Sequence, residues 1–548
     1  MEFSLYGLSD IVLSLKVTAL ANFFALLIVL STLTVLFIAP NYRLKRSFYL
    51  LFTLLVASLF LIVYAHDYLL FFIGWEVMSI STYFLLSFTL SKEALHKYIL
   101  FAMASALSLF VAILLLYSTQ HSFLYEDAKQ SYLAMSDGVQ QLFTLFMLIA
   151  IFIKLGTIGF HYWLVDAYEE SHNLFTPFLS AMLSKMGLYA LILFVANITQ
   201  ATYVLAVMGL LTTIIATFKA IEQESIKRLL AYSSIAQLGY IVTVLSVADG
   251  MGGALYHALI HTLVKLLLFI NIAGVIYVTQ KEKLSDLGGL IYKLPQSFVF
   301  LLIGIIVLAG MPPLGGFASK FMIYTALLDA KYLLLLAGVM FSSASAFIYV
   351  YKLIYGIYLG HPTHKNLEEV KEVPWTFLAP QYLLASLLVI IGTFPGLVIP
   401  YINRILGELN LTLLSFETIQ TLITSYAQYN GFVVMGAFGG IFVLVLMMFM
   451  LLRSKAKKPK NRFDIAYCAE EPNEATHLHY GYSMGQELKR VGLIHLIAKN
   501  SSKYFYDFLA KQMQYFSEVV RKIYSGNLLL NFNIAVLFLI ILLLWSLK

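Results

Sequence analysis

The chain has 548 residues, of which 60% are hydrophobic and only 12% are charged, and its formal net charge is +7. Soluble domains carry about 25% charged residues, so the composition excludes a soluble globular protein. Cys468 is the only cysteine in the sequence, which excludes disulfides within the chain and metal clusters built from cysteine. Uncharged apolar runs recur along the whole sequence, and they predict a polytopic membrane protein.

About fourteen apolar segments have the length, ~20 residues, that a helix needs to cross a bilayer. They run near 17–39, 47–65, 67–90, 94–118, 139–155, 176–198, 201–219, 229–247, 252–278, 296–330, 332–358, 376–398, 431–452 and 527–547. In the tenth, the stretch from Gly310 to Gly316 holds two prolines and three glycines, which must break the helix. A broken helix at membrane depth is tolerated where it is buried in protein or lines a wet cavity.

Basic residues gather in particular loops, which fall on one side of the membrane if the span count is right. These loops are 41–46, 92–97, 219–228, 281–293 and 453–462. The positive-inside rule makes that side cytoplasmic. We therefore expect a multi-pass protein of the cell inner membrane with both termini outside.

The region after the thirteenth span has a different pattern. From about 484 to 524, apolar residues recur at helical spacing with Lys and Glu between them, as in an amphipathic helix lying on a surface. At ~1.5 Å per residue such a helix reaches ~60 Å. We expect a lateral helix on the cytoplasmic side that clamps neighbouring membrane subunits.

An internal repeat divides the chain. Spans two to six and spans seven to eleven each form a set of five, and the fourth span of each set carries a Lys and a glycine-rich interruption. Because five is odd, the two units have opposite orientations, as in the inverted repeats of transporters. The predicted parts are an N-terminal span and loop (1–46), a first repeat (47–198), a second repeat (201–358), additional spans (376–452), a cytoplasmic loop with the lateral helix (453–526) and a C-terminal transmembrane anchor (527–548).

Ionisable residues inside the predicted spans are the candidate functional groups. His257, His261 and Lys265 recur at i, i+4 and i+8, so they form one polar stripe on an apolar helix. A Lys at bilayer depth costs several kcal/mol unless it is paired or hydrated. Glu76, Lys154, Lys185 and Lys320 also lie in apolar spans, and together the seven residues predict a line of titratable groups along the midplane.

Simpler interpretations exist for each group. Lys154 and Lys185 lie near predicted helix ends, from which they would reach a surface. The two histidines would serve helix packing, whereas a shared metal ion is disfavoured because Lys265 would repel it. A polar stretch formed by Asp166, Glu169, Glu170 and His172 is expected to be a solvated turn or a channel mouth rather than a catalytic set.

These segments resemble the antiporter-like, proton-translocating subunits of respiratory complex I, membrane-bound hydrogenases and multisubunit cation/proton antiporters. The resemblance covers about 47–358 and rests on Gly74-Trp75-Glu76, on Lys185-Met186-Gly187-Leu188-Tyr189, on 227–234, on the stripe and on 310–320. It implies that Glu76 is the essential glutamate of the family and Lys154 its broken-helix partner. It further implies that Lys185 and Lys265 are relay lysines, with His257 and His261 beside Lys265, and that Lys320 is the terminal residue of the second broken helix.

The C-terminal part is similar to the distal complex I subunit, although two N-terminal spans usual in the family are not seen and the lateral helix is shorter. These differences favour a membrane-bound hydrogenase or a compact complex I. The expected function is proton translocation in a redox-driven complex whose partner subunits supply the redox chemistry, so no cofactor site and no catalytic residue is predicted. The alternatives are a Na⁺/H⁺ antiporter subunit, a proton-conducting partner of an inorganic-carbon uptake system, and a passive membrane scaffold.

Overall fold

The computed structural model describes residues 2–6, 12–199, 202–359 and 369–453, together with 507–508, 510–515 and 517–518. Two compact units divide the chain, Met1–Gly485 and Gln486–Lys548. Most of the predicted lateral helix and the whole predicted anchor, 527–548, lie outside the described residues. The described residues between 507 and 518 are helical and belong to the second unit.

The first unit is an assembly of helices. Its first half contains α1 (Ala19–Ile38), α2 (Arg46–Tyr64), α3 (Tyr68–Leu86), α4 (Lys92–Gln120), α5 (Ala128–Ala134), α6 (Asp137–Leu155), α7 (Tyr162–Glu170), α8 (Thr176–Phe178), the π-helical turn η2 (Leu179–Leu183) and α9 (Ser184–Asn197). Its second half contains α10 (Thr202–Glu222), α11 (Ile226–Val244), α12 (Met251–Thr279), α13 (Pro295–Ala309), α14 (Gly315–Asp329), α15 (Leu333–Ile354), α16 (Trp375–Thr393), α17 (Ile399–Glu408) and α18 (Gly431–Arg453). This order confirms the predicted all-helical polytopic fold.

Eleven helices of the described residues are long and apolar enough to cross a membrane. The predicted eighth span, which forms α11, is not among them. The predicted tenth span is also not among them because it forms two shorter helices, α13 and α14, which are separated at Gly310–Leu314 as the prolines and glycines predict. The first predicted interruption is also present, since α6 ends at Leu155 and α7 begins at Tyr162. The total of fourteen spans and the inverted repeats stay predictions.

Several small elements were not expected. Two antiparallel hairpins flank the helices, β1 (Glu2–Tyr6) with β2 (Val12–Lys16) and β3 (Thr421–Ile423) with β4 (Gln428–Asn430). Asp166, Glu169 and Glu170 belong to the helix α7, so the expectation of a polar loop was wrong for these three residues. Short elements of this kind are set by contacts between distant segments, and local sequence patterns report them poorly.

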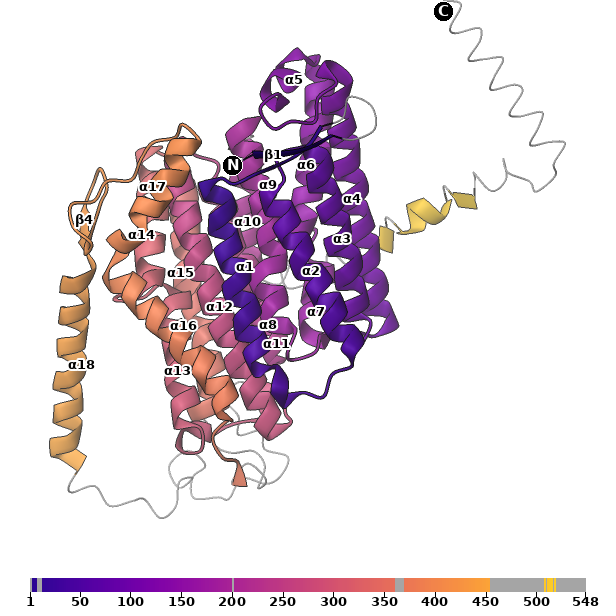
Figure 1. Ribbon diagram of the computed structural model, residues 1–548. Coiled ribbons are helices and arrows are strands. Elements are labelled where there is room, and N and C mark those ends of the chain that lie inside the picture. The colour runs from indigo at the N-terminus through magenta and orange to yellow at the C-terminus, as the bar shows by residue number, and fades with distance from the viewer. Residues whose placement is uncertain are drawn as a thin grey trace, which may run out of the picture. The chain divides into compact units, whose positions relative to one another are not determined.

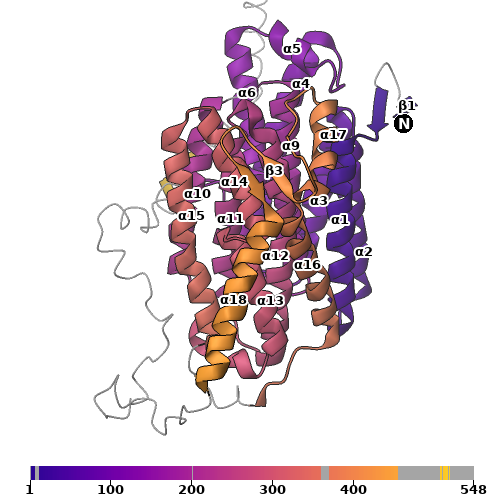
Figure 2. The same ribbon diagram turned by 90° about the vertical axis from the view of Figure 1, so that its left-hand side faces the viewer.

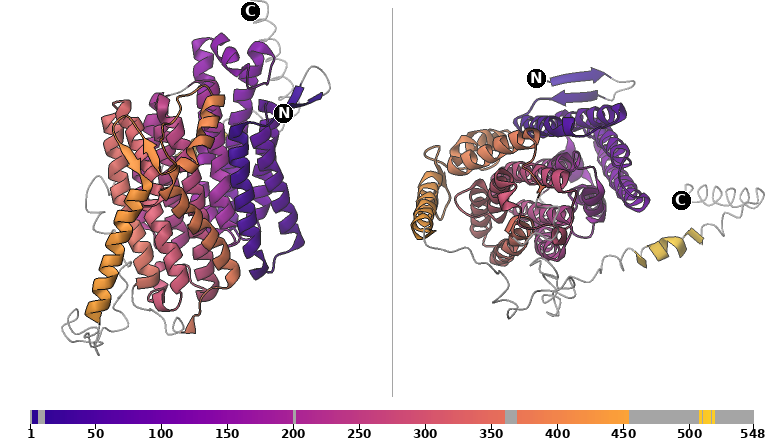
Figure 3. Two further views of the ribbon diagram at one scale, coloured as in Figure 1. Left: turned by 60° about the vertical axis from the view of Figure 1, so that its left-hand side comes forward. Right: turned by 90° about the horizontal axis from the view of Figure 1, so that it is seen from below.

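The long helices run roughly parallel, and α5 and α17 lie toward the same end of the bundle (Figure 1). We call this end the α5 end; the loops after α1 and before α13 lie at the opposite end. The helix α12 occupies the interior, where it packs against α11, α13, α14 and α16. By contrast, α18 lies at the rim (Figure 2; Figure 3), and only 6% of its apolar window is buried. A helix in the buried interior therefore carries the predicted polar stripe.

Candidate functional site

The predicted stripe on α12 lies inside the protein. His257, His261 and Lys265 are each at most 3% exposed. The two imidazole rings stack with centroids 6.2 Å apart and an interplanar angle of 10°, as residues one turn apart on a helix allow. Two rings and an amine thus follow one another along a single face of the helix.

The amine of Lys265 is bound by neutral groups from α11. Its Nζ donates to Ser233 Oγ at 2.6 Å and to the Leu230 carbonyl oxygen at 3.1 Å. No carboxylate of the described residues lies within ion-pair distance of this amine. A buried amine with only neutral partners responds strongly to any charge that arrives nearby, because little solvent screens it.

Lys320 lies where the second broken helix is interrupted. α13 ends at Ala309, and the following Gly310 has a left-handed φ of 75°. The Lys320 Nζ donates to the Ala309 carbonyl oxygen at 2.8 Å and to Ser343 Oγ at 2.8 Å. Carbonyl groups at a helix C-terminus lack helical partners and attract positive charge. The broken helix therefore creates the binding place for this amine.

Tyr240 connects Lys320 with the stripe on α12. The Lys320 Nζ lies 5.1 Å from the centroid of the Tyr240 ring, and that ring lies 6.0 Å from the ring of His257. His257 Nδ1 also shares a hydrogen bond of 3.0 Å with Ser319, the residue before Lys320. Side chains from α11, α12 and α14 thus meet in one cluster.

Lys185 lies on the other side of the stripe, directly after the π-helical turn η2. Its Nζ donates to the Ser180 carbonyl oxygen at 3.2 Å, and Ser180 Oγ lies 3.4 Å from Ser234 Oγ. Ser234 Oγ in turn donates to the Leu230 carbonyl oxygen at 2.9 Å, the same oxygen that Lys265 binds. Single π-helical turns are frequent at functional sites. A path of hydroxyl and carbonyl groups therefore runs between the two lysines.

Lys154 and Glu76 make a separate pair of sites. Lys154 Nζ donates to Ser79 Oγ at 2.8 Å and lies 5.5 Å from the centroid of the Trp75 ring. Glu76 is partly exposed on α3. Among the described residues it makes no ion pair with Lys154, although the two charges interact at longer range. The expected partnership is therefore not a direct contact.

The alternative in which Lys154 and Lys185 reach a surface was wrong. Both are buried, Lys154 at 1% exposure and Lys185 at 0%. Lys154 lies in the last turn of α6, just before the left-handed Gly156 that ends the helix. A position close to a helix end does not imply exposure here, because α6 ends inside the protein.

Several buried polar atoms near this line have no partner within the protein in the described part of the chain. They are His257 Nε2, both ring nitrogens of His261, Tyr240 Oη, Tyr349 Oη and Ser184 Oγ. Buried polar atoms in proteins are almost always hydrogen-bonded, and ordered water satisfies those that the protein does not. The interior along α12 is therefore suited to hold water between the ionisable side chains.

The predicted channel mouth lies at the end opposite α5. Arg228 pairs with Asp166 and Glu169, and Lys227 forms an ion pair of 3.3 Å with Glu282. A cavity of about 370 Å³ is lined by Glu170, His172, Lys227, Glu282 and four neighbours. Burial, aided by the nearby Lys227 charge, lowers the pKa of His172, so this imidazole favours its neutral form.

Sequence reasoning named the seven ionisable residues but missed their partners. These are mainly hydroxyl-bearing residues: Ser79, Ser180, Ser233, Ser234, Ser319, Ser343 and Tyr240. Serine is common in helices, where it bonds to its own backbone, and nothing in its spacing separates these positions from others.

The fold and the buried groups define a polytopic, ion-translocating class of membrane protein. Residues 65–347, just over half of the chain, match the family model described as "NADH:quinone oxidoreductase/Mrp antiporter, TM". The chain belongs to this family, which confirms the resemblance stated above.

Similar proteins come from several complexes. NADH-quinone oxidoreductase subunit N of Desulfitobacterium hafniense is 29% identical over 68% of this chain and 82% of that protein. A Na(+)/H(+) antiporter subunit of Bacillus subtilis is 27% identical over 64% of this chain and 48% of that protein. A chain in the structure of a membrane-bound sulfane sulfur reductase, an archaeal respiratory membrane complex, is 26% identical with a TM-score of 0.88, covering 99% of this chain and 91% of that chain.

Proposed function

We propose that this chain moves protons across the membrane as a subunit of a redox-driven complex, through Glu76, Lys154, Lys185, His257, His261, Lys265 and Lys320. The observation that carries the proposal is the buried sequence of amines and imidazoles from Lys185 to Lys320, joined by hydroxyl groups. In a passive scaffold we would expect each buried Lys to be paired with a carboxylate. In the described residues the four relay lysines bind hydroxyl and carbonyl oxygens instead.

The order of the groups suggests the path. Glu76 and Lys154 control the cytoplasmic input, Lys185 and the stripe of His257, His261 and Lys265 relay the proton, and Lys320 releases it outward. Two unit charges ~6 Å apart at an effective dielectric of ~20 interact by ~2.8 kcal/mol, about a hundredfold in an equilibrium. The arrival of one proton is therefore enough to displace the next.

The direct test replaces Lys265 in the intact complex, reconstituted in vesicles. Lys265→Ala should abolish proton pumping while electron transfer in the partner subunits continues at a reduced rate. Lys92→Ala is the matched control, because Lys92 is exposed at the start of α4. Unchanged pumping by the Lys265→Ala complex would rule out this route.

Sodium/proton exchange is a second candidate, because one similar protein is part of a Na(+)/H(+) antiporter. Replacing sodium by choline in the flux assay distinguishes the two functions. Proton movement that continues in choline supports proton translocation alone, whereas its loss supports exchange.

We further propose the arrangement of the complex. The likeness to a chain of a respiratory membrane complex supports other membrane subunits as partners. The predicted lateral helix, 484–524, would contact them on the cytoplasmic side, with both termini outside and the two five-helix repeats, 47–198 and 201–358, in opposite orientations. On this basis the α5 end of the bundle faces outward.

A further inference from the structure

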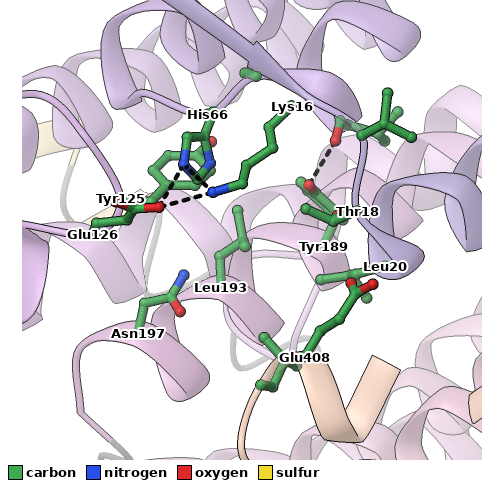
Figure 4. A pocket seen from close by; sticks show the side chains of 14 residues that line it. Lys16, Thr18, Leu20, His66, Tyr125, Glu126, Tyr189, Leu193, Asn197 and Glu408 are labelled. Atoms are coloured by element: carbon green, nitrogen blue, oxygen red, sulfur yellow. Dashed lines mark hydrogen bonds and ion pairs between the residues drawn. The ribbon is translucent and has the colours of Figure 1, made fainter. Parts of the chain in front are cut away.

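A polar pocket of about 370 Å³ opens at the α5 end, away from the line of groups described above. Its lining includes Lys16, His66, Glu126, Tyr189, Leu193 and Asn197, several of which are labelled in Figure 4. The residues come from β2, from the connections that follow α2 and α4, and from α9. The proposed proton path does not use this pocket.

Three charged or titratable side chains in the lining of the pocket form a contact, which we call the latch. Lys16 Nζ donates to Glu126 Oε1 at 2.8 Å, and His66 Nε2 lies 3.2 Å from both of these atoms (Figure 4). Lys16 ends the N-terminal hairpin, His66 precedes α3, and Glu126 lies between α4 and α5. The latch therefore joins three separate segments at one side of the pocket.

The wall of the pocket leads toward Lys185. Tyr189, Leu193 and Asn197 follow Lys185 on α9 at steps of four residues, so they lie on neighbouring parts of one helix face. At ~1.5 Å per residue, one turn of about 6 Å separates Lys185 from Tyr189. The pocket thus reaches the helix turn next to a buried relay lysine.

The region around Tyr189 is polar as well as buried. The Tyr125 side chain lines the pocket at 7% exposure, and its hydroxyl has no partner within the described residues. The hydroxyl of Tyr68, whose ring lies 4.6 Å from that of Tyr125, is also buried and without a partner there. Asp67 is fully buried beside them, but its carboxylate already accepts hydrogen bonds from two backbone N–H groups. The two tyrosine hydroxyls are groups of the kind that internal water ordinarily satisfies.

We propose that this pocket is an outward-facing water vestibule for Lys185, and that Tyr189 is the plug that separates the vestibule from the lysine. This inference rests on the proposed function, because it gives Lys185, one of the proposed relay groups, a second route to water, from the outer side. It assigns the Lys16, His66 and Glu126 latch to the outer opening of the vestibule.

The packing of Tyr189 suits a plug. Its side chain is 2% exposed, its hydroxyl donates to the Val63 carbonyl oxygen at 2.7 Å, and the Phe24 ring lies 5.1 Å away edge-to-face. A relay group with open access to both sides would let protons flow back and dissipate the gradient. A closed vestibule beside Lys185 is therefore compatible with pumping, and an open one is not.

Thiol labelling tests the vestibule. In a Cys468→Ser background, which carries no other cysteine, Asn197→Cys in the whole complex should react with a membrane-impermeant thiosulfonate added from the outer side. Leu191→Cys is the matched control, because Leu191 is fully buried on the same helix. Equal lack of reaction at both positions overturns the vestibule.

Passive proton leak tests the plug. Vesicles containing the Tyr189→Ala complex, without electron donor, should lose an imposed pH gradient at least about tenfold faster than wild type. Tyr189→Phe keeps the ring, so vesicles with this variant should hold the gradient as well as wild type does. The double variant Tyr189→Ala with Lys185→Ala should also hold it, because the leak through Lys185 is removed. A Tyr189→Ala complex as tight as wild type, or a leak that survives loss of Lys185, overturns the proposal.

The two proposals fail in distinguishable ways. If Lys185 is no relay group, Lys185→Ala alone still pumps, and this result does not depend on the labelling of Asn197→Cys. If Lys185 is a relay group without outer access, Lys185→Ala stops pumping while Tyr189→Ala leaves the membrane tight. Should the Tyr189→Ala complex not assemble, the labelling pair decides the vestibule by itself.

Discussion

At the scale of single residues, the partners of the buried lysines matter as much as the lysines. Lys154, Lys265 and Lys320 each donate to a serine hydroxyl at 2.6 to 2.8 Å. A carboxylate in place of that hydroxyl would hold the proton on the amine. A hydroxyl can bind the amine in both forms, because it accepts a hydrogen bond from the charged amine and can donate one to the neutral amine. The hydroxyl partners therefore allow these lysines both to take up and to release a proton.

The Ser233 hydroxyl should be important for the rate of proton pumping. Ser233→Ala removes the 2.6 Å acceptor of Lys265 and leaves that amine with the Leu230 carbonyl oxygen. A hydrogen bond to a charged group is worth about 1.5–3 kcal/mol, so we expect pumping to slow by roughly tenfold or more. Ser118→Ala, an exposed serine on α4, is the control for proton transfer measured in vesicles. Equal rates for the two variants would contradict this role.

The pH response of Glu126 is a second residue-scale prediction. Hydrogen bonds from Lys16 and His66 lower the pKa of Glu126 from its ordinary 4.5. Since the folded pKa is depressed, the contact contributes stability above pH 4.5 and loses it as pH falls through the lower folded value. The protection of the amides of residues 12–16, measured as their hydrogen-exchange rate relative to the intrinsic rate at the same pH, should therefore fall in wild type below about pH 4.5. In the Glu126→Gln variant the same amides should be less protected than in wild type, to an extent that does not change with pH. An identical pH profile in wild type and variant would contradict the latch.

At the scale of elements, the broken helices place the amines. Gly310 adopts φ of 75° at the end of α13, and a Cβ added there would lie 2.4 Å from Lys320 Cδ. Gly156 ends α6 in the same conformation, next to Lys154. In both cases a left-handed residue ends the helix and leaves carbonyl groups without helical partners, which a nearby cation can bind.

Gly310→Ala should therefore lower both stability and transport. The left-handed conformation costs a residue with a Cβ about 1–2 kcal/mol, and the contact with Lys320 adds to it. We expect a lower thermal unfolding temperature in detergent and slower pumping. Gly436→Ala on α18 is the control, because nothing lies within 4 Å of its added Cβ. A Gly310→Ala protein as stable and active as this control would show that the break tolerates a side chain.

Some of these elements could be predicted from the sequence alone, and others could not. The apolar spans, the break at Gly310 to Gly316 and the stripe on α12 follow from composition, proline and glycine chemistry, and helical spacing. The hairpins, α7 and α17 do not, because contacts between distant segments decide them. The serine partners of the lysines likewise depend on which helices meet in the folded chain, since Ser79 on α3 binds Lys154 on α6 and Ser343 on α15 binds Lys320 on α14.

At the scale of the whole molecule, burial separates two kinds of helix. α12 is 94% buried over its apolar window, whereas α18 is 6% buried at the rim. Ionisable groups are costly in contact with lipid, so the interior helices carry them. The rim helices present apolar residues to lipid or to other membrane subunits. This division agrees with a protein that conducts protons internally and assembles through its outer surface.

We propose that Lys185, Lys265 and Lys320 act in series. Groups that act as one unit have non-additive effects, so each single Ala variant should lose about as much pumping as the triple variant. The measurement is the number of protons moved per electron pair in reconstituted vesicles, compared across the three single variants and the triple. We expect the same near-complete loss in all four variants, whereas partial losses that add up across the three positions would contradict a serial path.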